Sequence, residues 1–227
     1  MIRLILVRHG NTFEAGQVAT QVGARTDLPL TAQGRKQAEQ LGDYFLSQSI
    51  RPAAIYAGTL TRQIESAEII AQRLCVEERL KVREPSLTEI DYGAWEGLTS
   101  EEISRRWPTE YNGWTEAGEW AEGIFGGSLQ SHKSNIDRWL ATIRKTYVSG
   151  DVIIAVSSNG LIRFFSDEWE KLAAAKQIDK LKVKTGHFCE LELHPDRLKV
   201  KSWNITPLSI ARFAIGLFVF AGDYLFF

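Results

Sequence analysis

Residues 2–10 read IRLILVRHG, an almost unbroken apolar run that is closed by Arg8, His9 and Gly10. Such a run is typical of a strand that is covered on both faces in a parallel sheet. In open α/β sheets, ligands bind beyond the carboxyl ends of these strands, where loops and helix N-termini converge. The run therefore predicts a buried strand that delivers an imidazole and a fixed positive charge to a binding site.

Two later segments repeat this order of strand, polar loop and helix. Residues 53–57 form a short strand-like run before residues 60–74, where apolar side chains recur at helical spacing. Residues 151–156 are strongly β-prone and precede the polar turn 157–160 and a helix from about Leu161. Strands joined in this way pair in parallel, so the three units predict one parallel sheet.

The remaining elements complete the predicted architecture. Thr31 can cap a helix whose inward face carries Leu41 and Phe45. Polarity alternates over residues 188–193 and 198–203, which predicts an antiparallel hairpin at the sheet edge. We expect an α/β fold, a three-layer sandwich with a mostly parallel central sheet, helices on both faces and an antiparallel edge hairpin.

The domain organisation follows from shifts in composition. Residues 1–207 are expected to form one domain, with an insertion at about 93–127 that is rich in Trp, Gly and Glu. Within the insertion, Thr99 and Glu102 have the spacing of a helix capping box. We interpret the insertion as a lid over the site, and a plain surface excursion is the alternative.

The last segment, residues 208–227, holds five of the eleven phenylalanines and only two charged residues, Arg212 and Asp223. The apolar stretch between those charges is too short to cross a bilayer, which argues against a membrane anchor. A packed terminal helix, a homodimer contact and a sequence artefact all stay open for this Phe-rich tail.

Composition excludes several classes of protein. The chain has 27 Lys and Arg against 28 Asp and Glu and no basic tract, so a nucleic-acid partner is not expected. Cys75 and Cys189 belong to no CxxC pair or Cys/His cluster, which predicts free thiols and no zinc site. The N-terminal apolar run is too short for a secretory signal, so we expect a cytoplasmic protein.

Four short motifs follow one another along the chain. They are RHG at 8–10, LPLTAQG at 28–34, LTR at 60–62 and LTEIDYGAWEG at 87–97. Each motif alone is weak, but their order and spacing resemble the histidine phosphatase superfamily, with its phosphoglycerate-mutase-like fold, and in particular its bacterial phosphatase branch. The likeness runs from Ile2 to about Pro207.

The resemblance implies a role for each motif. His9 would take up the phosphoryl group as a phosphohistidine that water then hydrolyses, and a neutral imidazole is a competent nucleophile for this step. Arg8 and Arg62 would clamp the phosphoryl oxygens, because a guanidinium fork matches phosphate geometry. Glu89 would protonate the leaving oxygen and later activate water, which requires a raised pKa. No metal or cofactor is expected, since positioning and charge supply much of phosphoryl-transfer catalysis.

The chain departs from the family pattern at one important place. Residues 157–163 read SSNGLIR, and Ser158 stands where the family carries a second histidine. Losing a charge-assisted hydrogen bond costs about 1.5–3 kcal/mol, or roughly 10- to 150-fold in rate. Ser158, Asn159 and the N–H groups entering the next helix are expected to form a partly compensating anion cradle. His187 is the only other candidate substitute, and we interpret it as a strand-edge residue.

Smaller departures concern the substrate contacts. Asn11, which we include among the phosphate-binding residues, stands where many relatives have Glu. Gln63, Glu65 and Ser66 replace the commoner Ala, Gln and Thr after Arg62.

These observations favour a metal-independent phosphomonoester hydrolase that acts on a small phosphorylated substrate and is attenuated by the change at Ser158. The alternative is a catalytically weak or inactive phosphate-ligand-binding or regulatory protein on the same fold. A mutase is less favoured, because the sequence offers no large or basic insertion to seal the intermediate from water.

Overall fold

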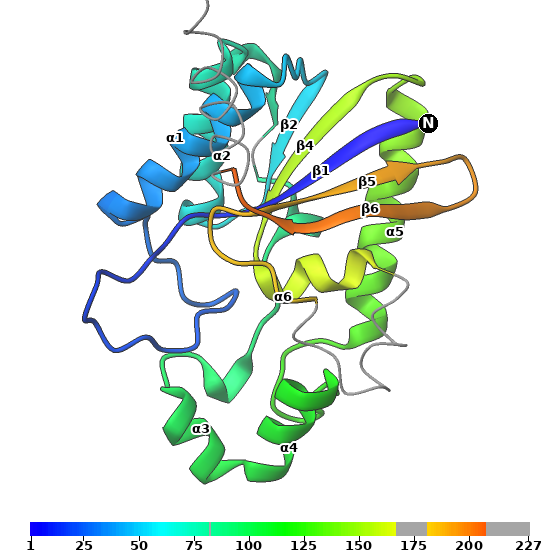
Figure 1. The fold of residues 1–227 in the computed structure, drawn as a ribbon. Helices are drawn as coiled ribbons and strands as arrows, with labels where there is room; N and C mark the ends of the chain where they lie inside the picture. The colour runs from blue at the N-terminus through cyan, green and yellow to red at the C-terminus, as the bar shows by residue number, and fades with distance from the viewer. Residues whose placement is uncertain (82, 167–180, 208–227) are drawn as a thin grey trace, which may run out of the picture.

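The computed structural model describes residues 1–81, 83–166 and 181–207, and it contains a central sheet of six strands in the order β3-β2-β4-β1-β5-β6 (Figure 1). Parallel pairs join β1 to β4, β4 to β2 and β2 to β3, whereas β5 is antiparallel to both β1 and β6. The strands are β1 (Ile2–Arg8), β2 (Ala54–Ala57), β3 (Leu80–Lys81), β4 (Val152–Ser157), β5 (Phe188–Leu193) and β6 (Leu198–Ile205). The predicted fold class is confirmed.

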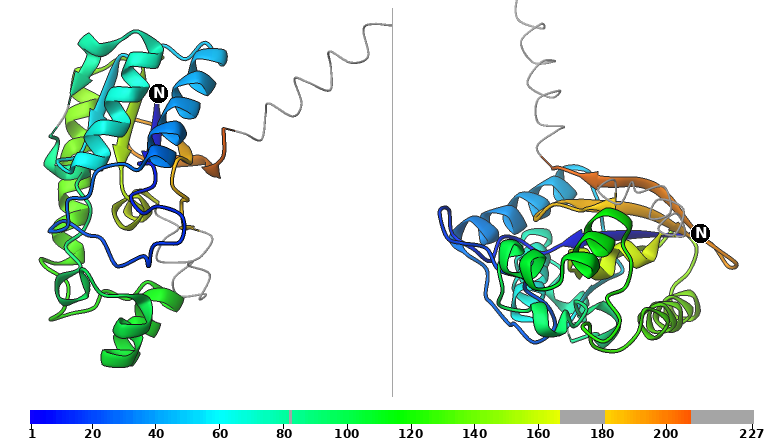
Figure 2. Two further views of the ribbon diagram at one scale, coloured as in Figure 1. Left: turned by 90° about the vertical axis from the view of Figure 1, so that its left-hand side faces the viewer. Right: turned by 90° about the horizontal axis from the view of Figure 1, so that it is seen from below.

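Helices cover both faces of this sheet (Figures 1 and 2). They are α1 (Ala32–Ser47), α2 (Thr61–Leu74), α3 (Ser100–Arg106), α4 (Pro108–Asn112), α5 (Leu129–Thr146) and α6 (Asn159–Ile162). Short 3-10 turns are η1 (Glu77–Arg79), η2 (Pro85–Leu87), η3 (Gly93–Trp95) and η5 (Arg163–Phe165), and η4 (Gly113–Ala117) is a π turn. None of the described helices is long and apolar enough to cross a membrane.

The alternation of side chains along β1 divides the core into two layers. Ile5 and Val7 pack with the buried faces of α1 and α2, whereas Leu4 and Leu6 pack with α5. This arrangement explains the near-continuous apolar run at the N-terminus, because a central strand buried on both faces has no solvent-facing position.

Helix boundaries follow local chemistry where the sequence carries a cap. The hydroxyl oxygen of Thr31 accepts from the N–H of Gly34 at 3.0 Å and starts α1. Thr99 and Glu102 form the expected capping box of α3. The helix expected from about Leu161 begins two residues earlier and is short, because α6 passes into η5 at Arg163. The Phe-rich tail lies outside the described residues.

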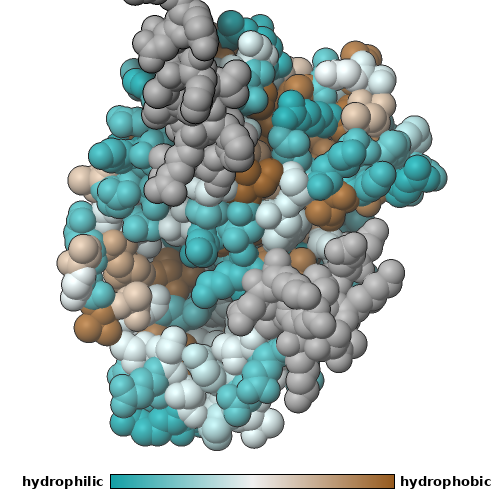
Figure 3. All heavy atoms as spheres, in the orientation of Figure 1, coloured by the Kyte–Doolittle hydropathy of each residue, from teal (hydrophilic) through white to brown (hydrophobic). Residues whose placement is uncertain are grey.

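The aromatic residues of the insertion pack against one another. The ring of Phe125 makes edge contacts with Tyr92, Trp95, Trp114 and Trp120, at centroid distances of 5.2, 4.9, 5.1 and 5.2 Å. The insertion lies below the sheet in Figure 1, and the surface over α3 and α4 is hydrophilic to intermediate in Figure 3. These contacts give the tryptophans a packing role, while the lid function stays a prediction.

Candidate active site

A cavity of about 470 Å³ lies where β1, β4 and the loop between β1 and α1 meet the insertion. Six of the seven predicted site residues line it: Arg8, His9, Asn11, Arg62, Glu89 and Asn159. The seventh, Ser158, is buried but does not contribute to the wall. The structure therefore gathers these side chains from four separate segments of the chain into one cleft, as the parallel-sheet argument predicts.

His9 is held in one tautomer by its own backbone neighbour. Its Nδ1 atom lies 2.7 Å from the carbonyl oxygen of Gly10. Because a carbonyl only accepts, Nδ1 carries the proton and the lone pair of Nε2 is free. Burial, and then the positive charges of Arg62 and Arg8, hold the pKa of His9 well below its usual range. The imidazole is therefore neutral and nucleophilic at neutral pH.

Gly10 is required by the close approach of α1. A Cβ atom at this position would lie 2.2 Å from the carbonyl oxygen of Gly34 in the first turn of that helix. The glycine lets the chain pass against the helix while its carbonyl still faces the imidazole of His9.

Arg8 projects from the last position of β1 and is anchored at one end of its guanidinium. Its Nη1 atom donates to the carbonyl oxygen of Val183 at 2.6 Å. Burial lowers the pKa of Arg8 to about 10, while the nearby carboxyl of Glu89 acts in the opposite direction. Arg8 therefore keeps its positive charge at neutral pH.

Arg62 lies in the first turn of α2 and is only 1% exposed. Its Nη1 and Nη2 atoms donate to the carbonyl oxygens of Thr26 at 2.7 Å and Gly23 at 3.1 Å. Burial lowers the pKa of Arg62, and the charge of Glu89 opposes this shift. Two loop carbonyls thus fix the plane of a buried guanidinium beside His9.

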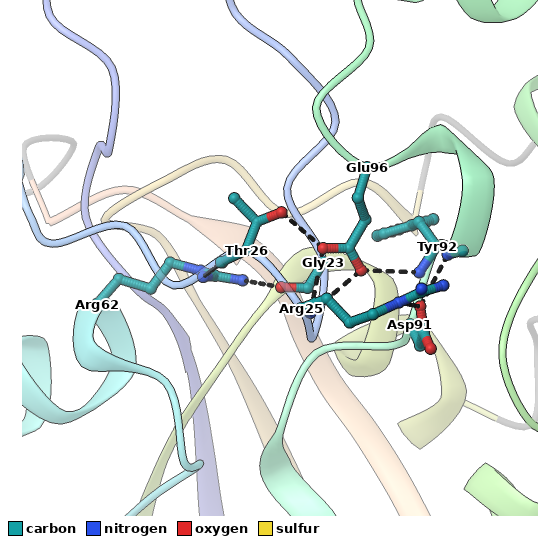
Figure 4. A network of polar contacts seen from close by, with 8 residues as sticks. Gly23, Arg25, Thr26, Arg62, Asp91, Tyr92 and Glu96 are labelled. Carbon is teal, nitrogen blue, oxygen red and sulfur yellow. Dashed lines mark hydrogen bonds and ion pairs between the residues drawn. The ribbon is translucent and has the colours of Figure 1, made fainter.

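The loop that binds Arg62 is itself held by Glu96 (Figure 4). The carboxylate of Glu96 accepts from the backbone N–H of Arg25 at 3.1 Å and from that of Tyr92 at 3.2 Å. It also accepts from the hydroxyl of Thr26 at 2.6 Å. The motif residue Glu96, which has no obvious chemical task in the sequence, therefore positions the segment that orients Arg62.

Asp91 adds a second tie to the same loop. Its Oδ1 atom accepts from the side chain of Arg25 at 2.7 Å and from the N–H of Gly93 at 2.8 Å. Figure 4 shows this ion pair beside Glu96, so two carboxylates of one motif hold one loop.

The carboxyl of Glu89 is buried and lies against the N-terminus of α6. Its oxygens accept from the N–H groups of Ile90 at 2.9 Å, Gly160 at 3.1 Å and Leu161 at 2.9 Å. Burial raises the pKa of Glu89, whereas these bonds and the charges of Arg62 and Arg8 lower it. The N–H groups expected to form an anion cradle are therefore already bonded to Glu89, which is a correction to the prediction.

Asn11 is fixed from two directions at the rim of the cavity. Its N–H donates to the side-chain oxygen of Gln37 at 2.8 Å, and its Oδ1 accepts from the hydroxyl of Thr185. His187 does not line the cavity, and its Nδ1 lies 3.2 Å from the carbonyl oxygen of Asn204. The only substitute histidine considered from the sequence is thus placed outside the site.

Sequence reasoning missed three further residues of the cavity wall, Arg163, Lys182 and Thr185. Arg163 is 7% exposed, and its guanidinium carbon lies 5.4 Å from the centre of the Trp114 ring. Arg163 closes the SSNGLIR stretch that holds Ser158 and Asn159, which was a usable signal. Residues 182 and 185 lie in an irregular segment without periodicity, so the sequence carries no signal for them.

The cavity is lined by both cationic and aromatic side chains. The aromatic residues that line it are Phe13, Tyr92, Trp95, Tyr111 and Trp114. The loop between β1 and α1 borders the cavity, and hydrophobic residues gather on its outer surface in Figure 3. Among the described residues, no group of three or more His, Cys, Asp or Glu side chains could hold a metal ion.

Comparisons with known proteins agree with this geometry. The family model described as "Histidine phosphatase superfamily (branch 1)" matches residues 4–206. Phosphoserine phosphatase 1 of Hydrogenobacter thermophilus is 30% identical over 154 residues, which is 68% of this chain and 70% of that protein. The uncharacterized phosphatase PhoE of Bacillus subtilis is 26% identical over 206 residues, or 90% and 95% of the two chains.

Solved structures show the same fold. A mycobacterial glucosyl-3-phosphoglycerate phosphatase in complex with VO3 has a TM-score of 0.76 at 23% identity, covering 90% of this chain and 99% of that one. YhfR of Bacillus stearothermophilus has a TM-score of 0.70 at 22% identity, covering 92% and 100%. The chain therefore belongs to the histidine phosphatase superfamily, branch 1, and is a phosphatase of that family.

Proposed function

We propose that the protein hydrolyses small phosphate monoesters through a phosphohistidine on Nε2 of His9, without a metal ion. The observation that carries this proposal is the neutral imidazole, whose Nδ1 is held by the Gly10 carbonyl in a cleft with two buried arginines. A fixed tautomer and a preorganised positive environment are what an in-line attack on phosphorus requires.

The reaction proceeds in two steps that both use Glu89. Nε2 of His9 attacks phosphorus, the bond to the ester oxygen breaks, and the leaving oxygen takes a proton from Glu89. Water then attacks the phosphohistidine and gives its proton to Glu89, the N–P bond breaks, and its electron pair returns to Nε2 as inorganic phosphate leaves. A raised pKa supports the first role, because the carboxyl must hold a proton when the substrate binds.

Arg8 and Arg62 carry the positive charge that stabilises the phosphoryl oxygens in both steps. Backbone carbonyls hold both guanidiniums, Arg8 through Nη1 and Arg62 through Nη1 and Nη2, which reduces the reorganisation needed when the anion binds. Asn11 supplies a polar group at the rim.

We further propose that turnover is attenuated by the residue at position 158. Without an imidazolium at this position, the site loses one charge-assisted hydrogen bond to a dianion, which costs about 1.5–3 kcal/mol, or roughly 10- to 150-fold in rate. The matching relatives include a phosphoserine phosphatase, and a structural neighbour acts on glucosyl-3-phosphoglycerate. Their names support a small phosphate ester as substrate, and the cavity volume suits one.

The test is hydrolysis of an aryl phosphate in the presence of EDTA by the parent protein and by His9→Ala. We expect turnover by the parent, loss of turnover in the variant, and an acid-labile phosphoryl group on the parent after rapid quenching. If both proteins are equally inert but still bind phosphate esters, the protein is a phosphate-ligand-binding protein instead. The observation that favours this second candidate is that Ser158 is buried and does not line the cavity, so position 158 offers the phosphoryl group no charged donor.

A further inference from the structure

Gln63 has a fully buried side-chain amide that uses each of its polar atoms. Its Nε2 donates to the carbonyl oxygen of Leu87 at 3.1 Å and to the hydroxyl oxygen of Ser158 at 2.9 Å. Its Oε1 accepts from the N–H of Leu60 at 3.3 Å. Because a carbonyl only accepts and an N–H only donates, the orientation of this amide is fixed.

Gly58 provides the space that the amide occupies. A Cβ atom at position 58 would lie 2.1 Å from Oε1 of Gln63 and 2.7 Å from the carbonyl oxygen of Leu87. The side chain of Gln63 is therefore tightly packed between the start of α2 and the residue that follows β4.

Ser158 forms the other half of this buried pair. It follows Ser157, which pairs with Arg8 across β4 and β1, so its backbone runs beside His9. Its side chain is nevertheless 1% exposed, accepts from Gln63 and is absent from the cavity wall. The bond to Gln63 thus holds the serine hydroxyl on the α2 side of the sheet and away from the place where a substrate would lie.

Asn159, the next residue, faces the cavity instead. Its Oδ1 accepts from the N–H of Val183 at 2.8 Å, and the carbonyl oxygen of Val183 accepts from Arg8 at 2.6 Å. Val183 therefore holds the side chains of Asn159 and Arg8 next to each other. Since Oδ1 is engaged, Nδ2 is the atom available to the cavity, and no described residue accepts a hydrogen bond from it.

We infer that Asn159, and not Ser158, supplies the neutral hydrogen bond to the phosphoryl group beside Arg8, and that Gln63 withholds Ser158 from this role. The inference rests on the proposed function for the identity of the anion. Of the two side chains predicted to bind the anion together, Asn159 binds it, and Ser158 packs with Gln63 behind the site. Asn159 thereby becomes a binding residue, while Gln63 is a positioning residue that acts through Ser158.

The first experiment measures vanadate binding, followed by tryptophan fluorescence, and aryl phosphate hydrolysis for Asn159→Ala and Ser158→Ala. We expect Asn159→Ala to weaken vanadate binding and to lower kcat/KM by about 5- to 10-fold, the range of a neutral hydrogen bond. Ser158→Ala should bind vanadate within about two-fold of the parent. The inference is overturned if the serine variant loses as much affinity as the asparagine variant, or if Asn159→Ala binds as the parent does.

The vanadate affinity of Asn159→Asp provides a second test at the same site. The substitution keeps the side-chain shape but replaces the donor by a carboxylate, so we expect a larger loss of vanadate affinity than for Asn159→Ala. Equal affinity in the two variants would show that the Nδ2 group does not face the anion. Thermal unfolding of each variant distinguishes a local loss from a folding defect.

The second experiment tests the pair through Ser158→His, alone and together with Gln63→Ala. An imidazole at position 158 needs space that Gln63 fills, so the single variant should unfold at a lower temperature and gain no activity. The double variant should unfold near the temperature of the parent and should be more active than Ser158→His alone. The two substitutions would then be strongly coupled. A single Ser158→His variant that is stable and more active than the parent would refute the pairing.

Failure of this inference is separable from failure of the proposed function. If the parent does not hydrolyse the aryl phosphate and matches His9→Ala, the hydrolase proposal fails. The vanadate affinities then still decide between Asn159 and Ser158, because they need no turnover.

Discussion

Glu96 determines the orientation of Arg62 through the loop that lies between them. The carboxylate of Glu96 binds the hydroxyl of Thr26, and the carbonyl oxygen of the same threonine accepts from the guanidinium of Arg62. A side chain outside the cavity wall thereby controls a side chain inside it. Such an arrangement makes Glu96 a positioning residue, whose removal is expected to act on substrate binding mainly through Arg62.

We expect Glu96→Gln to lower kcat/KM by about 10-fold, because an amide cannot accept all the hydrogen bonds that the carboxylate accepts. In an Arg62→Lys background the same change should have little further effect, since the guanidinium that it orients is gone. Steady-state kinetics on the four proteins of this cycle provide the measurement. Additive losses in the cycle would contradict an action through Arg62.

Glu102→Ala is the matched control for that cycle. Glu102 belongs to the same insertion and caps α3, but it does not line the cavity. Loss of this cap should lower the free energy of unfolding by about 1 kcal/mol while kcat stays at the parent value.

The pH dependence of activity should reflect the lowered pKa of His9 and the raised pKa of Glu89. In the proposed mechanism, the first step requires a neutral His9, whose pKa lies well below 6.5, and a protonated Glu89, whose pKa is raised above 4.5. The rate therefore rises as pH increases through the pKa of His9 and falls as pH increases through that of Glu89, so the profile should be bell-shaped. Glu89→Gln should lower kcat by about 10²- to 10⁴-fold on an alkyl phosphate and abolish the alkaline limb. An unchanged pH profile in that variant would remove Glu89 from proton transfer.

The same shift of His9 should appear in folding stability. The folded state disfavours protonation of His9, whereas the unfolded chain protonates it near pH 6.5. Stability is therefore present above the unfolded pKa and is lost as pH falls below it toward the folded pKa. We expect denaturant titrations at pH 7.5 and 5.5 to show a smaller stability loss for His9→Asn than for the parent. A parallel loss in both proteins would argue against a buried neutral imidazole.

Gly10→Ala should both destabilise the protein and reduce turnover. The added methyl group would collide with the carbonyl of Gly34, which predicts a loss of about 1–3 kcal/mol. Movement of Gly10 would also disturb the carbonyl that fixes the tautomer of His9. Gly16→Ala in the same loop is the control, because its Cβ meets no atom within 4 Å and its positive φ alone costs about 1 kcal/mol. Equal kcat in the two variants would dismiss the tautomer argument.

The sequence predicted those features that depend on local periodicity and on motif order. The apolar run before His9, the cap at Thr31 and the alternating edge hairpin each carry a local signal, and each occurs as predicted. The two-residue strand β3 carries too little pattern to be found, and α6 is shorter than expected because it passes into a 3-10 turn.

The parts of the site that were missed depend on contacts between distant segments. The bond from Gln63 to Ser158 spans 95 positions, and the bonds from Glu89 to the start of α6 span 71 and 72. No pattern within one segment reports such a pairing, so the sequence places these side chains near the site but does not assign their partners.

The bond from Arg8 to Val183 joins positions that are 175 residues apart, and it has a consequence for folding. A growing polypeptide carries its nucleophile from the first moments of synthesis, but the neighbouring cation has no anchor until residue 183 has emerged and docked. Phosphatase activity should consequently arise only with the last stage of tertiary assembly, since such nonlocal contacts form slowly. A nascent chain would thus be protected from acting on cellular phosphate esters before its fold is complete.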